Sequence, residues 1–157
     1  MTTLSNFEKI KEFHATFSRT PDPTSLDLRT PEDRLLRGKL IWEEVLEVFA
    51  ELGVLIEVQM QPQEDGNVML EFEPITDESK TEFNPRNLAK ELADLKYVTY
   101  GTDASFGIDA DRVYGEVHDS NMSKLGPNGE VLRREDGKVL KGPNYREPSL
   151  SFLPESI

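Results

Sequence analysis

Apolar side chains recur every three or four residues in four segments of the chain, and this spacing predicts four amphipathic helices. The first begins at a capping box formed by Ser5 and Glu8 and is expected to reach about Ser18. The second has an N-cap at Thr30, a proline at its first position and a predicted end at Gly53. Both helices are therefore bounded by local signals as well as by periodicity.

Two further helices are expected in the second half of the chain. The third begins at Asn84 and Pro85 and is predicted to end at Gly101, since glycine adopts the left-handed conformation common at helix ends. The fourth is capped by Asp109 and is expected to run to about Lys124.

The segment between the second and third helices alternates partly in polarity, which is typical of β-strands. Residues 54–60 and 68–73 are expected to form a short hairpin around EDGN, although 54–60 could equally prolong the second helix. The expected fold is all-α, an antiparallel four-helix bundle with a small β-like insertion and an extended C-terminal tail rich in Gly, Pro and Asn. It forms a single domain over 1–157, with a helical core at 5–53 and 85–124, an insertion at 54–80 and a tail at 125–157.

The composition is that of an acidic soluble protein. With 157 residues the chain can bury a core, and its formal net charge of −12 argues against binding to polymeric nucleic acid or anionic membranes, because both present phosphate. Small phosphate-bearing substrates are compatible with this charge if metal ions neutralise them. The chain has no cysteine, no apolar segment typical of a signal peptide and no apolar run long enough to span a bilayer, so we expect a cytoplasmic protein.

Almost all of the net charge lies in one quarter of the chain. Between Leu40 and Ser79 there is no Lys, Arg or His, whereas eleven residues are acidic. They are Glu43, Glu44, Glu47, Glu51, Glu57, Glu64, Asp65, Glu71, Glu73, Asp77 and Glu78. Either this stretch is a solvated acidic surface, or a cation from outside the chain binds there.

Two acidic pairs border the apolar faces of the predicted helices. Glu44 and Glu47 are three residues apart on the second helix, and Glu91 and Asp94 are three apart on the third. A carboxylate at the margin of a core has to be paired or to hold a metal, since burying it alone costs several kcal/mol. Lys90 and Lys96 mark the solvent side of the third helix. If these two helices pack together, four carboxylates converge with no basic residue in reach.

Ligands that offer only carboxylate oxygen suit Mg²⁺ or Mn²⁺. Di-iron bundles also use inward glutamates, but they need a Glu-x-x-His motif, and neither His14 nor His118 lies in one. The alternative is that each pair is a charge cluster on a helix surface, which is the commoner meaning of a single E-x-x-E.

Several motifs together resemble a known superfamily. WEEVLEVFAE is followed by KELADLKYVTYG, then by GIDADRVYGEVHDSNMSK and DGKVLKGPNYREP. In this order the motifs resemble the all-α nucleoside triphosphate pyrophosphohydrolases, which include MazG, phosphoribosyl-ATP pyrophosphohydrolase and the dimeric dUTPases, and the chain is most similar to short MazG-like proteins with dUTPase-type activity. The insertion at 54–80 is longer than the superfamily usually has between its acidic pairs.

The resemblance implies a function for the acidic residues. Glu44, Glu47, Glu91 and Asp94 are expected to ligate Mg²⁺, with Mn²⁺ as a possible substitute, and Glu43 is expected to orient or deprotonate the attacking water. The superfamily hydrolyses the α/β phosphoanhydride of a nucleoside triphosphate to the monophosphate and pyrophosphate.

The resemblance also implies contacts to the substrate. The residues concerned are Asn121, Lys124, Lys138, Lys141, His14 and Phe17. The first four match positions near the sugar and phosphates, although exposed surface is an equally good interpretation of Lys138 and Lys141. His14 and Phe17 lie where relatives line the base pocket, but packing in the core is the commoner role for both. Trp42 is expected in the core or at a dimer interface.

The leading hypothesis is therefore a Mg²⁺-dependent pyrophosphohydrolase that removes dUTP, or next dCTP, from the nucleotide pool. Members of the superfamily are dimers or tetramers, so a homodimer or a dimer of dimers is expected. One alternative is phosphoribosyl-ATP as substrate. Another is a non-catalytic acidic helical module that binds a basic partner through residues 43–78.

Overall fold

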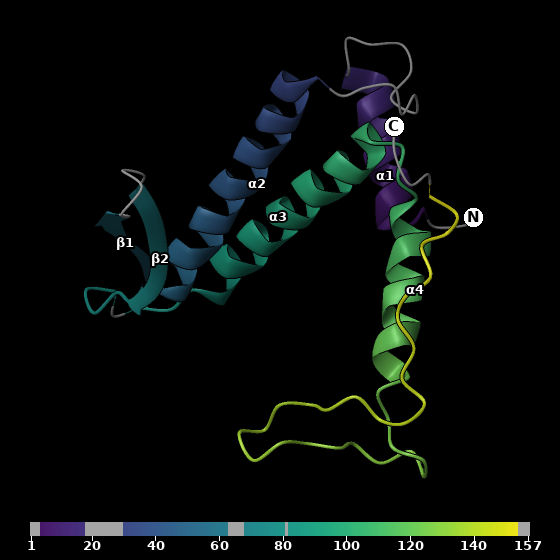
Figure 1. The fold of residues 1–157 in the computed structure, drawn as a ribbon. Helices are drawn as coiled ribbons and strands as arrows, with labels where there is room; N and C mark the ends of the chain where they lie inside the picture. The colour runs from purple at the N-terminus through teal and green to yellow at the C-terminus, as the bar shows by residue number, and fades with distance from the viewer. Residues whose placement is uncertain (1–3, 18–29, 63–67, 81, 154–157) are drawn as a thin grey trace. The chain divides into compact units, whose positions relative to one another are not determined.

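The computed structural model describes residues 4–17, 30–62, 68–80 and 82–153, which contain four helices and one two-stranded sheet (Figure 1). In chain order these are α1 (Asn6–Phe17), α2 (Pro31–Leu52), β1 (Val54–Pro62), β2 (Val68–Thr76), α3 (Pro85–Ser105) and α4 (Ala110–Met122). They belong to two compact units, one of residues 30–99 and the other of residues 1–29 with 100–157. The mostly helical fold is confirmed, whereas the packing of all four helices in one bundle stays a prediction.

The predicted helix starts are confirmed in atomic detail. The Ser5 amide donates to the Glu8 carboxylate at 2.6 Å and the Glu8 amide donates to the Ser5 hydroxyl at 3.1 Å, which completes the capping box. The Thr30 hydroxyl accepts from the Asp33 amide at 3.2 Å at the start of α2. The Asp109 carboxylate accepts from the Arg112 amide at 3.1 Å at the start of α4. Each cap satisfies a backbone N–H that the helix itself leaves unpaired.

One helix end was predicted wrongly. Helix α2 ends at Gly53 as expected, with φ 69°, but α3 continues through Gly101 to Ser105. The chain turns instead at Gly107, whose φ is 63° and whose amide donates to the carbonyl of Ala104. A glycine inside a helix costs only about 1 kcal/mol relative to alanine. The glycines that end helices here, Gly53 and Gly107, have positive φ. Gly101 keeps the helical conformation and is buried within α3.

The insertion is a hairpin, so the alternative in which its first half prolongs α2 is wrong. Strands β1 and β2 pair antiparallel, with Val58 opposite Phe72 and Glu57 opposite Glu73. Opposite residues share a face, so one face carries apolar side chains and the other carries acidic ones. Two strands alone are marginally stable, and this hairpin is tied to α2 by an edge contact between Phe72 and Trp42, with ring centroids 6.2 Å apart.

A lysine after the hairpin secures the end of α2. The Lys80 ammonium donates to the backbone carbonyl of Ala50 and lies 3.3 Å from the Glu51 carboxylate. Helix C-termini leave their last carbonyls unpaired, and a cation there also interacts favourably with the helix dipole. The hairpin and α2 therefore hold each other in place.

The second unit has a small apolar core. Phe7 and Ile10 of α1 pack with Ala104 of α3 and Ala110 of α4, and Tyr100 covers them. The Ser5 hydroxyl donates to the Asp111 carboxylate at 2.7 Å and joins the starts of α1 and α4.

The extended tail is also confirmed, and it returns along α4. The buried Ser120 hydroxyl donates to the Arg146 carbonyl at 2.9 Å, and the Arg146 guanidinium lies 3.6 Å from Glu116 and 3.5 Å from Asp119. Further along the tail, the ring of Phe152 stacks against the Arg112 guanidinium, whose central carbon lies 3.7 Å from the ring centroid.

Two aromatic residues for which the core was one predicted location lie outside it, which leaves the dimer interface for Trp42 and the base contact for Phe17 as predictions. Phe17 is 69% exposed and Trp42 is 49% exposed. Both occupy helical positions whose periodicity matches a buried stripe, but no element of the described chain covers them fully. Within the described ranges, no helix combines the length and the apolar character needed to cross a membrane.

Candidate metal centre

Helices α2 and α3 bring three carboxylates together. The two helices run in opposite directions in Figure 1, joined by the hairpin. One side-chain oxygen each from Glu44, Glu91 and Asp94 lie within 4.8 Å of one another. The spacing of three residues places Glu91 and Asp94 on the same side of α3, and packing against α2 then adds Glu44.

Glu47 contacts Glu91 but is not one of the three carboxylates whose oxygens lie within 4.8 Å of one another. A hydrogen bond to Glu91 raises the pKa of Glu47, and the charges of Glu44 and Glu91 raise it further. Like charges at this separation disfavour ionisation, and a cation would relieve the repulsion. Three of the four predicted ligands thus share one possible ligand position, and Glu47 as the fourth ligand stays a prediction.

One oxygen of the cluster lacks a partner. Oε2 of Glu44 is buried and has no hydrogen-bond partner among the described residues. A buried carboxylate oxygen without a partner loses its hydration and gains nothing in return. Oxygen ligands of this kind fit a hard divalent cation, so these acidic residues could bind a metal.

A basic residue does reach the cluster, contrary to the expectation from the sequence. The Lys90 ammonium lies 2.8 Å from Asp94 and 3.0 and 3.2 Å from the two carboxylate oxygens of Glu91. These bonds, first to Asp94 and then to Glu91, raise the pKa of Lys90. The side chain is 65% exposed and its Cα lies on the solvent side of α3, but its long stem carries the charge back to the carboxylates.

The predicted general base lies beside the cluster rather than within it. Glu43 is exposed on α2 and is not among the three carboxylates that share a ligand position. It precedes Glu44 directly in the chain and lies one helical turn before Glu47.

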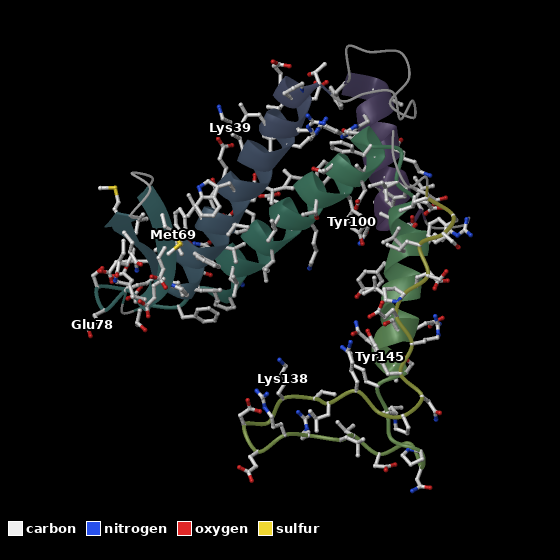
Figure 2. The ribbon with its side chains drawn as sticks, viewed as in Figure 1. Lys39, Met69, Glu78, Tyr100, Lys138 and Tyr145 are labelled. Carbon is white, nitrogen blue, oxygen red and sulfur yellow. The ribbon has the colours of Figure 1, made fainter. Side chains whose placement is uncertain are left out.

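The predicted phosphate and sugar contacts all lie in the unit of α1 and α4. The Lys124 ammonium donates to the Asn121 side chain at 2.6 Å, so these two residues act as a pair. Lys141 lies over the ring of Tyr145 at 4.1 Å. Lys138 is exposed on the tail loop (Figure 2).

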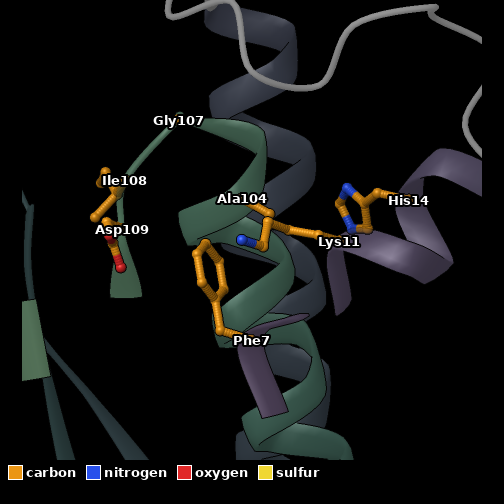
Figure 3. A pocket seen from close by; sticks show the side chains of 7 residues that line it. All are labelled: Phe7, Lys11, His14, Ala104, Gly107, Ile108 and Asp109. Carbon is orange, nitrogen blue, oxygen red and sulfur yellow. The ribbon is translucent and has the colours of Figure 1, made fainter. Parts of the chain in front are cut away.

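A cavity of about 150 Å³ opens beside α1 in the same unit (Figure 3). It is lined by Phe7, Lys11, His14, Ala104, Gly107, Ile108 and Asp109. His14 is buried and lines this cavity, so its position fits both a core residue and a ligand contact. Phe17 is not among the lining residues and lies against Phe13 instead, with ring centroids 4.7 Å apart.

Sequence reasoning missed two polar residues of the cavity. Lys11 lies one turn from both Phe7 and His14, and its ammonium is 4.9 Å from the Phe7 ring centre. Asp109 was recognised only as a helix cap. The helical spacing of Lys11 relative to His14 was the available signal, because residues three apart lie on the same face.

Comparison with known protein families identifies a match over most of the helical part of the chain. The family model described as phosphoribosyl-ATP pyrophosphohydrolase matches residues 10–121. This range includes both acidic pairs and the hairpin between them. No curated protein matches the chain.

Proposed function

The chain belongs to the phosphoribosyl-ATP pyrophosphohydrolase family and is thus a nucleotide pyrophosphohydrolase, a hydrolase of phosphoanhydride bonds. We propose that its substrate is a nucleoside triphosphate, dUTP or dCTP. The enzyme would cleave it to the monophosphate and pyrophosphate. The single observation that supports a catalytic centre most directly is the cluster of Glu44, Glu91 and Asp94 with its buried oxygen that has no partner. The role of such an enzyme would be to cleanse the nucleotide pool.

A second substrate is supported by the family match itself. Phosphoribosyl-ATP carries the same kind of triphosphate, and the matching model takes its name from that substrate. The acidic centre serves either substrate equally, since it would act on the phosphates. The base and the sugar attachment distinguish the two, and the contacts to them lie outside the centre.

We propose Mg²⁺ as the metal, with Mn²⁺ as a substitute, held by Glu44, Glu47, Glu91 and Asp94. All the donors are carboxylate oxygens, which hard cations prefer. When bound, such an ion neutralises phosphate charge and activates water for attack on phosphorus.

The other residues would act on the water and the substrate. Glu43, which is exposed and directly precedes Glu44, would accept the proton of the attacking water. Asn121 and Lys124, already joined by a hydrogen bond, would contact sugar and phosphate, and Lys138 and Lys141 would neutralise the outgoing pyrophosphate. His14 and Phe17 are proposed base contacts.

We propose that the protein acts as a homodimer in which the four helices of each chain complete a bundle. Large apolar side chains exposed on α2 support this assembly, namely Leu35, Leu36, Trp42 and Leu46. Multi-angle light scattering of the purified protein is expected to give twice the mass of the 17.9 kDa chain. A monomer across the micromolar range would contradict the assembly.

Pyrophosphate release from a panel of nucleotides tests the function. The panel contains the eight standard ribo- and deoxynucleoside triphosphates, dUTP and phosphoribosyl-ATP, each with Mg²⁺, with Mn²⁺ and with chelator. We expect release from dUTP or dCTP with either metal and none with chelator, because the carboxylates alone repel a triphosphate.

The outcomes of the panel separate the alternatives. Release from phosphoribosyl-ATP alone would favour the second substrate. An absence of release from every substrate, in a protein that binds no divalent ion, would favour the non-catalytic module in which residues 43–78 bind a basic partner.

A further inference from the structure

Lys90 pairs with two of the residues proposed as metal ligands. Its ammonium contacts Asp94 at 2.8 Å and both oxygens of Glu91 at 3.0 and 3.2 Å. The same two carboxylates lie, with Glu44, in the cluster that could hold a divalent cation. A metal cation bound by Glu91 and Asp94 would therefore use the same carboxylates that the Lys90 ammonium contacts.

The burial of the three side chains shows how the ion pair could be exchanged. The Glu91 side chain is 13% exposed, whereas those of Asp94 and Lys90 are 43% and 65% exposed. The Glu91 carboxylate is largely covered by its surroundings, whereas the Lys90 ammonium reaches it from solvent on a flexible side chain. Lys90 can thus leave the carboxylates without any change in the backbone of α3.

The ion pair leaves part of the centre without compensation. The described contacts of the ammonium are with Glu91 and Asp94, whereas the buried oxygen of Glu44 has no partner. The single positive charge of Lys90 contacts two of the carboxylates but offsets the charge of only one, and it does not satisfy the third. A divalent cation could contact all three and carries twice the charge.

From these contacts we propose that Lys90 is an internal counter-ion that occupies the carboxylates of Glu91 and Asp94 in the metal-free protein, and that the divalent cation has to displace it. Lys90 in this way sets the cation concentration at which the centre fills. The proposal rests on the proposed function only in taking these carboxylates as the metal ligands.

Titration of Mn²⁺ into the metal-free protein, followed by calorimetry without nucleotide, tests this role in a K90M variant. Removal of the ammonium is expected to tighten Mn²⁺ binding about two- to 25-fold, because the cation no longer breaks two ion pairs, each of which accounts for a factor of roughly 1.5 to 5. The melting temperature in chelator is expected to fall, since the carboxylates then repel one another without a counter-ion.

Two further variants control for charge. Lys96 is exposed on the same helix, and K96M removes an equal charge from a side chain for which the structure shows no contact with the cluster. K96M and the charge-retaining K90R are both expected to bind Mn²⁺ as the wild type does.

The results distinguish failure of this inference from failure of the proposed function. Equal or weaker Mn²⁺ binding by K90M would overturn the role of Lys90, as would an equal gain in K96M. No Mn²⁺ binding by any variant, including the wild type, would overturn the metal centre itself and the role of Lys90 with it.

Discussion

Replacement of Glu91 by Gln is expected to abolish divalent-cation binding and to lower kcat/KM about 10³-fold or more. Glu91 is the residue to which the rest of the centre connects: its carboxylate lies near Glu44 and Asp94, bonds to Glu47 and accepts from Lys90. The amide keeps the size of the side chain but loses the charge that holds a cation. Loss of the several kcal/mol that a metal contributes to the transition state corresponds to this factor.

The matched control for E91Q is E57Q, which makes the same chemical change in the hairpin. Glu57 is exposed on the acidic face opposite Glu73 and lies outside the carboxylate cluster. We expect wild-type turnover in steady-state assays and wild-type Mn²⁺ binding in calorimetry. Turnover by E91Q within a few fold of the wild type would show that the metal assignment is wrong.

The same variant is expected to show a pH-dependent change in stability. Glu91 is the main cause of the raised pKa of Glu47, so the folded metal-free protein holds a proton there more tightly than the unfolded chain does. The contribution of that group to stability is present at low pH and is lost as the pH rises through its raised pKa. The melting temperature of E91Q in chelator should therefore rise relative to that of the wild type as the pH increases above 4.5, the ordinary pKa of a glutamate.

Replacement of Glu43 by Gln is expected to lower kcat about 10²- to 10⁴-fold while Mn²⁺ binding remains at the wild-type level. Glu43 lies on α2 directly before the cluster but is not one of the carboxylates that share a ligand position. The amide cannot accept a proton, and general-base catalysis typically contributes rate factors of this size. Steady-state kinetics and calorimetry on the same preparation measure the two effects.

Two outcomes would contradict the role of Glu43 in different ways. Loss of Mn²⁺ binding in E43Q would make Glu43 a metal ligand instead of a base. Turnover that stays within a few fold of the wild type would mean that another group accepts the proton. The E57Q control serves here too, because it reports the effect of removing one acidic charge elsewhere in the same unit.

The parts of the fold that depend on local chemistry could be predicted from the sequence. The caps at Ser5, Thr30 and Asp109 form as expected, because the side chain of each accepts from the backbone amide three residues further on. The hairpin was weaker as a prediction, since a short apolar run also fits a helix. Gly101 was mistaken for a helix end because its conformation depends on its neighbours in space.

The candidate site shows the same division. Spacing alone placed Glu91 and Asp94 on one side of α3, and packing of α2 against it adds Glu44 as expected. Spacing did not reveal Lys90, because its backbone position points to solvent and only the reach of its stem brings the ammonium to the carboxylates. The exposure of Trp42 and Phe17 was equally beyond the sequence, since periodicity predicts an apolar face without saying what covers it.

The return of the tail along α4 has a consequence for how the chain folds during synthesis. The hydroxyl of Ser120 finds its acceptor 26 residues later at Arg146, and Glu116 meets the amide of Ser149 after 33 residues. A growing chain emerges N-terminus first, so α4 exists for some time before these partners do, and the closing loops add an entropic barrier. We therefore expect α4 to become fully protected from amide exchange only after residues 146–149 have been synthesised and have docked against it.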